Sequence, residues 1–168
     1  MSKTIIKNIG TIVSGDIHAP ILQGSTIVVE NGIITAIGHR ELEEEGGGIT
    51  VIDAQQTTVT PGFFDSHVHV TIGDYGHRQH AAGFLESELH GGVTTVISAG
   101  EPHMPGRPKD PAGTKAMAML VSKSFYNAPP AGMKVHGGAL SLEKGLVEED
   151  FKELKEQGFW LVGEIGLG

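Results

Sequence analysis

The run Pro61-Gly62-Phe63-Phe64-Asp65-Ser66-His67-Val68-His69-Val70 decides the fold of this chain. Successive side chains of a strand alternate between its two faces, so His67 and His69 point the same way, roughly 6–7 Å apart along the strand. Two imidazoles at that spacing can converge on one cation, although an isolated His-x-His also occurs by chance in many strands. The other face of the strand carries Phe64, Ser66, Val68 and Val70.

The surroundings of this strand favour a metal site. A Pro-Gly break precedes it, and a glycine-rich loop containing Gly73, Tyr75 and Gly76 follows it. This arrangement is typical of a barrel strand that delivers ligands to the C-terminal mouth of the barrel.

From Gly62 onward, apolar strands alternate with helical patterns. Strands are expected at 63–70, 93–99, 133–140 and 159–165, and helices at 81–89, 112–120 and 147–154. Asp110-Pro111 predicts a helix start, Gly158 a helix end, and Glu148 with Lys152 an i, i+4 ion pair. Strands and helices in this order predict right-handed βαβ units with a parallel sheet.

Four such strands are half of a (β/α)8 barrel, which takes about 250 residues in all. Half a barrel would leave an apolar face and two sheet edges in water. We therefore expect the 168 residues to be the N-terminal part of a longer protein.

Residues 1–60 are expected to form a small β module, because their strands follow one another without helices. The expected strands are 4–6, 11–13, 26–30, 33–37 and 49–59, and Asn31-Gly32 predicts a hairpin turn between the third and fourth. The acidic, glycine-rich link 41–48 is interpreted as a solvated loop.

Composition excludes several classes of protein. Twelve basic against 20 acidic residues give a net charge of −8, which argues against a nucleic-acid partner. The chain has no cysteine, which excludes disulfides, thiolate zinc sites and a cysteine nucleophile. The first ten residues lack the pattern of a secretory signal and no apolar run approaches 18 residues, so we expect a cytoplasmic protein without a membrane partner.

Three segments, PGFFDSHVHV, GGVTTVISAG and VGEIGLG, make the chain resemble the amidohydrolase superfamily. His-x-His after Pro-Gly-x-x-Asp is specific to that superfamily, and the likeness extends over essentially the whole chain. The resemblance implies a β-sandwich module, here residues 1–60, followed by a barrel whose first four βα units are residues 61–168. GEIGLG is not a nucleotide loop, because its glycines are in the wrong order and no helix pattern follows.

Glu164 lies near the end of the fourth barrel strand, on the rim where His67 and His69 emerge. Many amidohydrolases carry at the matching position a carbamylated lysine that bridges two metals, but residues 159–168 contain no lysine. The resemblance implies that Glu164 supplies the bridging carboxylate directly. Lys134 would lie at the wrong end of the barrel, and the alternative for Glu164 is a charge paired at the barrel mouth.

Other polar residues on the expected catalytic side have two interpretations each. Asp65 is either an acceptor that orients an imidazole or a satisfied core aspartate. His136 either faces the substrate pocket or is hydrogen-bonded within the barrel. Tyr75 and Arg78 are candidate substrate contacts, and Arg78 or Arg107 either holds a substrate carboxylate or is a surface cation.

The function that the resemblance implies is hydrolysis of a C–N bond in a cyclic amide or enamide by a hydroxide that bridges two divalent ions, either zinc or a zinc and iron pair. The catalytic aspartate is expected beyond residue 168, and the assembly is expected to be a homodimer or homotetramer. Other cyclic-amide hydrolases of the dihydropyrimidinase, dihydroorotase or imidase type fit the same residues, as does an adenine-deaminase-like enzyme. A catalytically silent scaffold and an inactive fragment are the non-enzymatic alternatives.

Overall fold

The computed structural model describes residues 2–38, 48–70, 81–101, 106–127 and 129–165. The chain divides into two compact units, Met1–Pro61 and Gly62–Gly168. Among the described helices, none combines the length and the apolar character needed to cross a membrane.

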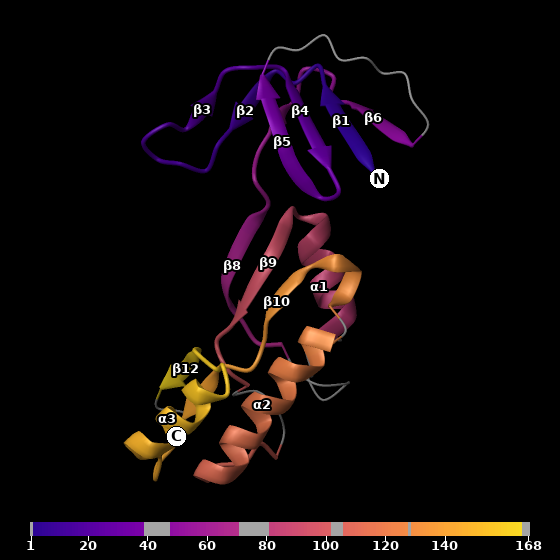
Figure 1. The fold of residues 1–168 in the computed structure, drawn as a ribbon. Coiled ribbons are helices and arrows are strands. Elements are labelled where there is room, and N and C mark those ends of the chain that lie inside the picture. Colours follow the sequence, from indigo (N-terminus) through magenta and orange to yellow (C-terminus); the bar gives the residue numbers. More distant parts are fainter. Residues whose placement is uncertain (1, 39–47, 71–80, 102–105, 128, 166–168) are drawn as a thin grey trace. The chain divides into compact units, whose positions relative to one another are not determined.

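The first unit consists of two small sheets (Figure 1). One has the order β5-β4-β1-β6 and the other the order β3-β2-β7. Ile9, Ile12 and Ile27 form a buried cluster, and Ile5 is also buried; each is at most 5% exposed. The strands are β1 (Lys3–Lys7), β2 (Thr11–Val13), β3 (Ile21–Leu22), β4 (Thr26–Glu30), β5 (Ile33–Gly38), β6 (Ile49–Asp53) and β7 (Thr58–Val59).

The predicted hairpin turn is confirmed. Asn31 and Gly32 both adopt positive φ, 51° and 82°, between the antiparallel strands β4 and β5. This is the backbone that a two-residue hairpin turn requires, and asparagine and glycine adopt it at the least cost.

The prediction of one strand over residues 49–59 is wrong. The segment is divided into β6, which pairs with β1, and β7, which pairs with β2. Gln55 and Gln56 have φ values of 49° and 63° between them, and Asp53 Oδ1 accepts the N–H of Gln55 at 2.8 Å. This local aspartate turn carries the chain from one sheet to the other. The short strand β3 was not predicted, and the predicted acidic loop lies almost wholly outside the described residues.

The second unit alternates strands with helices, as predicted. Strands β8, β9 and β10 form a parallel sheet of order β10-β9-β8, and β11 pairs in parallel with β12. The elements are β8 (Phe63–Val68), α1 (Ala81–His90), β9 (Val93–Ser98), α2 (Pro111–Asn127), the 3₁₀ turn η2 (Pro130–Gly132), β10 (Lys134–His136), β11 (Leu140–Leu142), α3 (Glu148–Glu156) and β12 (Val162–Ile165).

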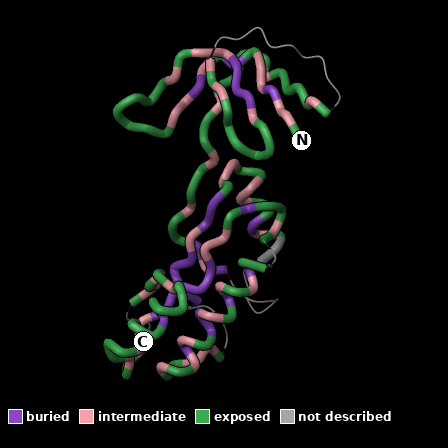
Figure 2. The backbone as a smooth tube through the Cα atoms, in the orientation of Figure 1, coloured by how far each residue is buried: buried purple, intermediate pink, exposed green. Residues whose placement is uncertain are grey.

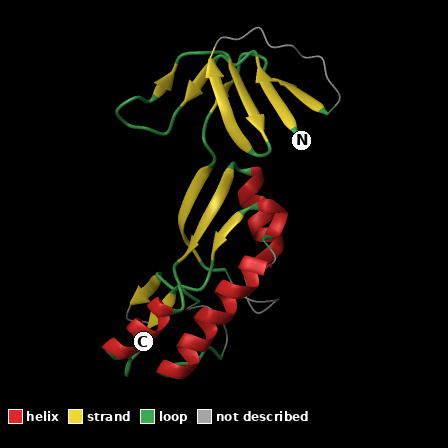
Figure 3. Cartoon of the chain, in the orientation of Figure 1, coloured by secondary structure: helices red, strands yellow, loops and turns green. Residues whose placement is uncertain are grey.

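Helices α1 and α2 lie along one side of the three parallel strands (Figure 3). Leu85 of α1 and Val121 of α2 pack with Val68 and Val96 of the sheet, and all four are at most 3% exposed. Figure 2 shows buried backbone, drawn in purple, in the middle of this unit. The alternate side chains of β8 therefore divide as the sequence predicted, with Val68 in the core and His67 outside it.

The prediction of one strand over residues 133–140 is wrong. β10 ends at His136, and β11 begins at Leu140 with β12 as its partner. The break falls at Gly137-Gly138, where α2 comes so close that a Cβ on Gly138 would lie 2.1 Å from the carbonyl oxygen of Ala118. Gly138 also has φ +80°, which turns the chain out of the first sheet.

The predicted helix ends and ion pair are confirmed. Asp110 Oδ1 accepts the N–H of Gly113 at 2.9 Å at the start of α2. Gly158 has φ +86° after α3, and Lys152 Nζ lies 2.7 Å from Glu148 Oε1.

Candidate metal centre

Three side chains from two distant strands converge at one end of the second unit. His67 Nε2 and His69 Nε2 each lie 3.2 Å from Oε1 of Glu164. The imidazole rings are 5.2 Å apart between centroids and meet edge to face at 89°. All three possible ligand atoms lie within 4.8 Å of one another.

Backbone hydrogen bonds align the strands that carry these side chains. The N–H of Ala99, just after β9, donates to the carbonyl of Val68 at 2.8 Å. The carbonyl of Ala99 in turn accepts the N–H of Glu164 at 2.8 Å. Val68 lies between the two histidines in the sequence, so these bonds place Glu164 beside them. Only glycine fits next to this row, because a Cβ on Gly163 would lie 2.1 Å from the Ala99 oxygen.

The tautomer of His69 is set by its other ring nitrogen. Nδ1 lies 2.8 Å from the carbonyl oxygen of Gly100, which can only accept a hydrogen bond. Nδ1 therefore carries a proton, and Nε2 faces Oε1 of Glu164 at 3.2 Å. A carbonyl behind a metal-binding histidine is the usual way in which the ring is oriented toward the cation.

His67 is the accessible member of the group. Its side chain is 65% exposed, whereas that of His69 is 17% and that of Glu164 is 27%. Asp65, for which the sequence left open an acceptor for an imidazole or a satisfied core aspartate, accepts the backbone N–H of His67 at 2.9 Å. Among the described residues its hydrogen bond is thus to the backbone of the candidate ligand and not to a ring.

Two nitrogens and a carboxylate oxygen suit a divalent cation of the zinc or iron type. Ligands bound at roughly 2.0–2.2 Å lie no more than about 4.4 Å apart, so a small closing movement of the side chains brings all three into bonding range. The side chains present therefore fit a metal ion.

No protein-family model matches this chain. Enamidase of Eubacterium barkeri is 67% identical over 168 residues, which are 100% of this chain and 44% of enamidase. The crystal structure of enamidase, described as a new member of the amidohydrolase superfamily, matches with a TM-score of 0.89 at 66% identity over 99% of this chain and 43% of that chain.

This chain belongs to the amidohydrolase superfamily. The resemblance inferred from the three sequence segments is thereby confirmed, as is the mixed α/β fold of that superfamily. A dihydroorotase of Lactiplantibacillus plantarum is 32% identical over 169 residues, covering 98% of this amidohydrolase chain and 36% of the dihydroorotase. The chain spans less than half the length of these relatives.

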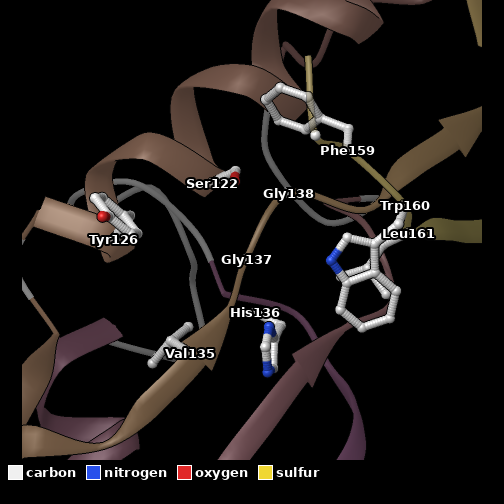
Figure 4. A pocket seen from close by; sticks show the side chains of 10 residues that line it. Ser122, Tyr126, Val135, His136, Gly137, Gly138, Phe159, Trp160 and Leu161 are labelled. Atoms are coloured by element: carbon white, nitrogen blue, oxygen red, sulfur yellow. The ribbon is translucent and has the colours of Figure 1, made fainter. Parts of the chain in front are cut away.

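The remaining candidate residues are only partly brought together. Tyr75 and Arg78 lie outside the described residues. His136 stacks edge to face on Trp160, with 5.4 Å between ring centroids, and the two rings lie next to each other in Figure 4. They line a cavity of about 190 Å³ between α2, β10 and the segment before β12. Burial lowers the pKa of His136, and the charge of Lys134 lowers it further.

Arg107 forms an ion pair with Glu143. The side chains are 8% and 9% exposed, so the pair is buried and links the segment before α2 to the segment after β11. Arg107 is thus not a surface cation, and its charge is already matched by a carboxylate.

Sequence reasoning missed a buried polar cluster directly behind the ligands. It consists of Ser98, Gly100 and Glu101, and Glu101 is only 1% exposed. Burial raises the pKa of Glu101 to about 9, against a smaller opposing effect of its hydrogen bond with Ser98. The available signal was an acidic residue that directly follows the apolar run of a strand.

Proposed function

We propose that the protein is a metal-dependent hydrolase that cleaves the C–N bond of a cyclic amide or enamide. The observation that carries this proposal is the convergence of His67, His69 and Glu164, whose ligand atoms lie within 4.8 Å. The 67% identity to enamidase supports the substrate class.

In this proposal His67 and His69 would hold one divalent cation, and Glu164 would be shared between it and a second. Zinc, or a zinc and iron pair, suits these donors. The remaining ligands and a catalytic aspartate would come from residues outside these 168. When bound, such ions supply a more acidic water and polarise the amide carbonyl.

In this proposal the chain orients the ligand nitrogens and supplies the ligand carboxylate. The Gly100 carbonyl holds the Nδ1 proton of His69, so Nε2 is the nitrogen that faces the candidate site. Glu164 brings a carboxylate without the carbon dioxide that a carbamylated lysine needs. A centre built in this way should not depend on bicarbonate.

The proposed substrate is 6-oxo-1,4,5,6-tetrahydronicotinate or a close analogue, a cyclic enamide of anaerobic nicotinate degradation. Addition of water to its ring amide breaks the C–N bond and leaves an enamine, and a second water releases ammonia to give 2-formylglutarate. Tyr75, Arg78 and His136 are the candidate contacts for the substrate. The second candidate function is dihydroorotate hydrolysis, which the 32% identity to a dihydroorotase over 98% of the chain favours.

The architecture proposed with this function is a (β/α)8 barrel. Residues 61–168 would supply its first four βα units, and residues 1–60 would be part of a β-sandwich module. The large exposed side chains Phe64, Trp160 and Ile165, which are 71%, 65% and 78% exposed, are the kind of surface that further barrel strands would cover. The enzyme is further proposed to be a cytoplasmic homo-oligomer.

The test uses the full-length protein. Elemental analysis should find about two metal ions per chain, and the purified protein should release ammonia from 6-oxo-1,4,5,6-tetrahydronicotinate. Dihydroorotate, a hydantoin, a dihydropyrimidine and adenine serve as competing substrates. Turnover of dihydroorotate alone would select the second function. A metal-free protein that is inactive on every compound, even after zinc and iron are supplied, would defeat both.

A further inference from the structure

Glu101 is a buried acid that the proposed ligand set does not use. It follows β9 at the end where the metal ligands lie and is 1% exposed. Its Oε1 lies 3.5 Å from Ser98 Oγ, and its Oε2 has no hydrogen-bond partner among the described residues. Since burial holds its pKa near 9, the carboxyl group is uncharged at neutral pH. Burying a carboxyl group with so few hydrogen-bond partners costs free energy of folding. We therefore asked what Glu101 does for the groups that it contacts.

Ser98 connects Glu101 to the backbone. Its Oγ accepts the N–H of Gly100 at 3.0 Å and the N–H of Ala139 at 3.4 Å. A hydroxyl has two lone pairs and one proton. With both lone pairs in use, its proton is directed to Glu101, which is its acceptor among the described residues.

Gly100 connects Ser98 to the metal centre. Its N–H is held by Ser98, and its carbonyl oxygen accepts the Nδ1 proton of His69 at 2.8 Å. The residue has φ +100°, and a Cβ there would lie 2.6 Å from Ser141 Oγ. The peptide group before Gly100 is therefore held by Ser98, and the carbonyl of Gly100 holds the His69 ring.

We propose that Glu101 is a positioning residue of the metal centre, which acts through Ser98 and Gly100 to hold the Nδ1 proton of His69 and the orientation of its ring. This inference rests on the proposed function, because only a centre that binds metal uses the other ring nitrogen, Nε2, as a ligand. Glu101 itself touches neither metal nor substrate. Its carboxyl orients the Ser98 hydroxyl, the hydroxyl orients Gly100, and the Gly100 carbonyl holds the ring.

The competing explanation is that Glu101 merely fills space. The two explanations differ for a pair of variants of similar size. Glu101→Gln keeps an oxygen that accepts from Ser98, whereas Glu101→Leu keeps the bulk and removes the acceptor. Ser98→Ala removes the connecting hydroxyl and leaves Glu101 in place.

Two measurements on the full-length protein test the proposal. The first is the zinc dissociation constant, measured by competition with a chromogenic chelator. We expect it to rise about 10–100-fold in Glu101→Leu and in Ser98→Ala, as for other residues that orient a metal ligand, and to stay within about twofold in Glu101→Gln. In the double variant Ser98→Ala/Glu101→Leu the rise should equal that of Ser98→Ala alone, because both changes break the same connection.

The second measurement is the tautomer of His69 in metal-free protein, read from ¹⁵N chemical shifts of labelled histidine and assigned with His69→Gln. Wild type and Glu101→Gln should show a proton on Nδ1, and Glu101→Leu and Ser98→Ala should show a mixture of tautomers. Circular dichroism and thermal unfolding establish that each variant is folded. If Glu101→Leu does not fold, Ser98→Ala decides the question.

An unchanged tautomer in a folded Glu101→Leu or Ser98→Ala overturns the proposal, as do effects on zinc affinity that multiply in the double variant. The failure of the proposed function would be seen separately. Wild-type protein that binds no zinc would refute the metal centre, while the tautomer measurement would still show whether Glu101 controls His69.

Discussion

The backbone N–H of Glu164 donates a 2.8 Å hydrogen bond to the carbonyl oxygen of Ala99. This bond joins the strand of the carboxylate to the end of β9, which is itself bonded to Val68 between the two histidines. The distance between carboxylate and imidazoles is thus fixed by backbone, and side-chain chemistry at Glu164 can be changed without moving the strand.

Replacing Glu164 by Gln should remove the anionic ligand and leave the backbone bond to Ala99 in place. Loss of a direct ligand should weaken zinc binding by more than the roughly 10–100-fold expected for an orienting residue, with little effect on the melting temperature of the metal-free protein. Elemental analysis and chelator competition measure the change. The matched control is Glu156→Gln at the exposed end of α3, which should bind zinc as wild type does. Equal zinc affinity in the two variants would remove Glu164 from the centre.

Replacing Gly163 by Ala should disturb the backbone hydrogen bonds that link Glu164, Ala99 and Val68. The added Cβ would lie 2.1 Å from the Ala99 oxygen, so β12 must shift, and we expect a loss of about 2–3 kcal/mol in unfolding free energy together with weaker zinc binding. The control is Gly83→Ala in α1, where a Cβ meets nothing within 4 Å. This substitution should stabilise the helix by up to about 1 kcal/mol. Urea unfolding measures both variants, and a neutral Gly163→Ala would show that the close approach is unimportant.

Replacing Arg107 by Met should leave the carboxylate of Glu143 buried without its cation. Breaking a buried pair in this way costs about 3–5 kcal/mol. Lys152→Met breaks the exposed pair with Glu148, whose side chains are 62% and 75% exposed, and should cost only about 0.3–0.5 kcal/mol. Chemical denaturation compares the two, and similar losses would argue that the Arg107 pair is not buried in solution.

Glu101 should make the stability of the metal-free protein depend on pH. Its pKa is about 9 in the folded state and 4.5 when unperturbed, so between those values the folded chain keeps a proton that the unfolded chain has lost. The contribution of the neutral acid is complete below pH 4.5 and declines as the pH rises toward 9, by up to about 1.4 kcal/mol per pH unit. Urea unfolding from pH 5 to 8 should show this decline in wild type and in Glu156→Gln, and a much smaller one in Glu101→Gln. Parallel curves for all three proteins would contradict the assigned pKa.

The strands of the site could be predicted because their signals are local. Alternation along one strand places His67 and His69 on one face, and parallel βαβ units bring the ends of strands 63–70 and 159–165 to one rim. Both inferences depend only on the order of strands and helices along the chain. In the structure, Oε1 of Glu164 lies 3.2 Å from Nε2 of both histidines.

The polar support behind the ligands could not be predicted, because it depends on contacts between distant segments. Ser98 and Glu101 are separated by two residues and are of types common in exposed turns. In the folded chain both are buried, and Ser98 is bonded to Ala139, which lies 41 residues away in the sequence. The break at Gly137-Gly138 likewise reflects the close approach of α2. Arg107 was taken as a substrate contact or a surface cation, since its partner Glu143 is 36 residues away in the sequence.

The order of the ligands along the chain has a consequence during synthesis. His67 and Glu164 are 97 residues apart, so a ribosome delivers both imidazoles long before it adds the carboxylate. A nascent chain therefore passes through a stage with two nitrogen donors and no acid to complete them. If the proposed centre uses all three side chains, it can be completed only after β12 has been translated.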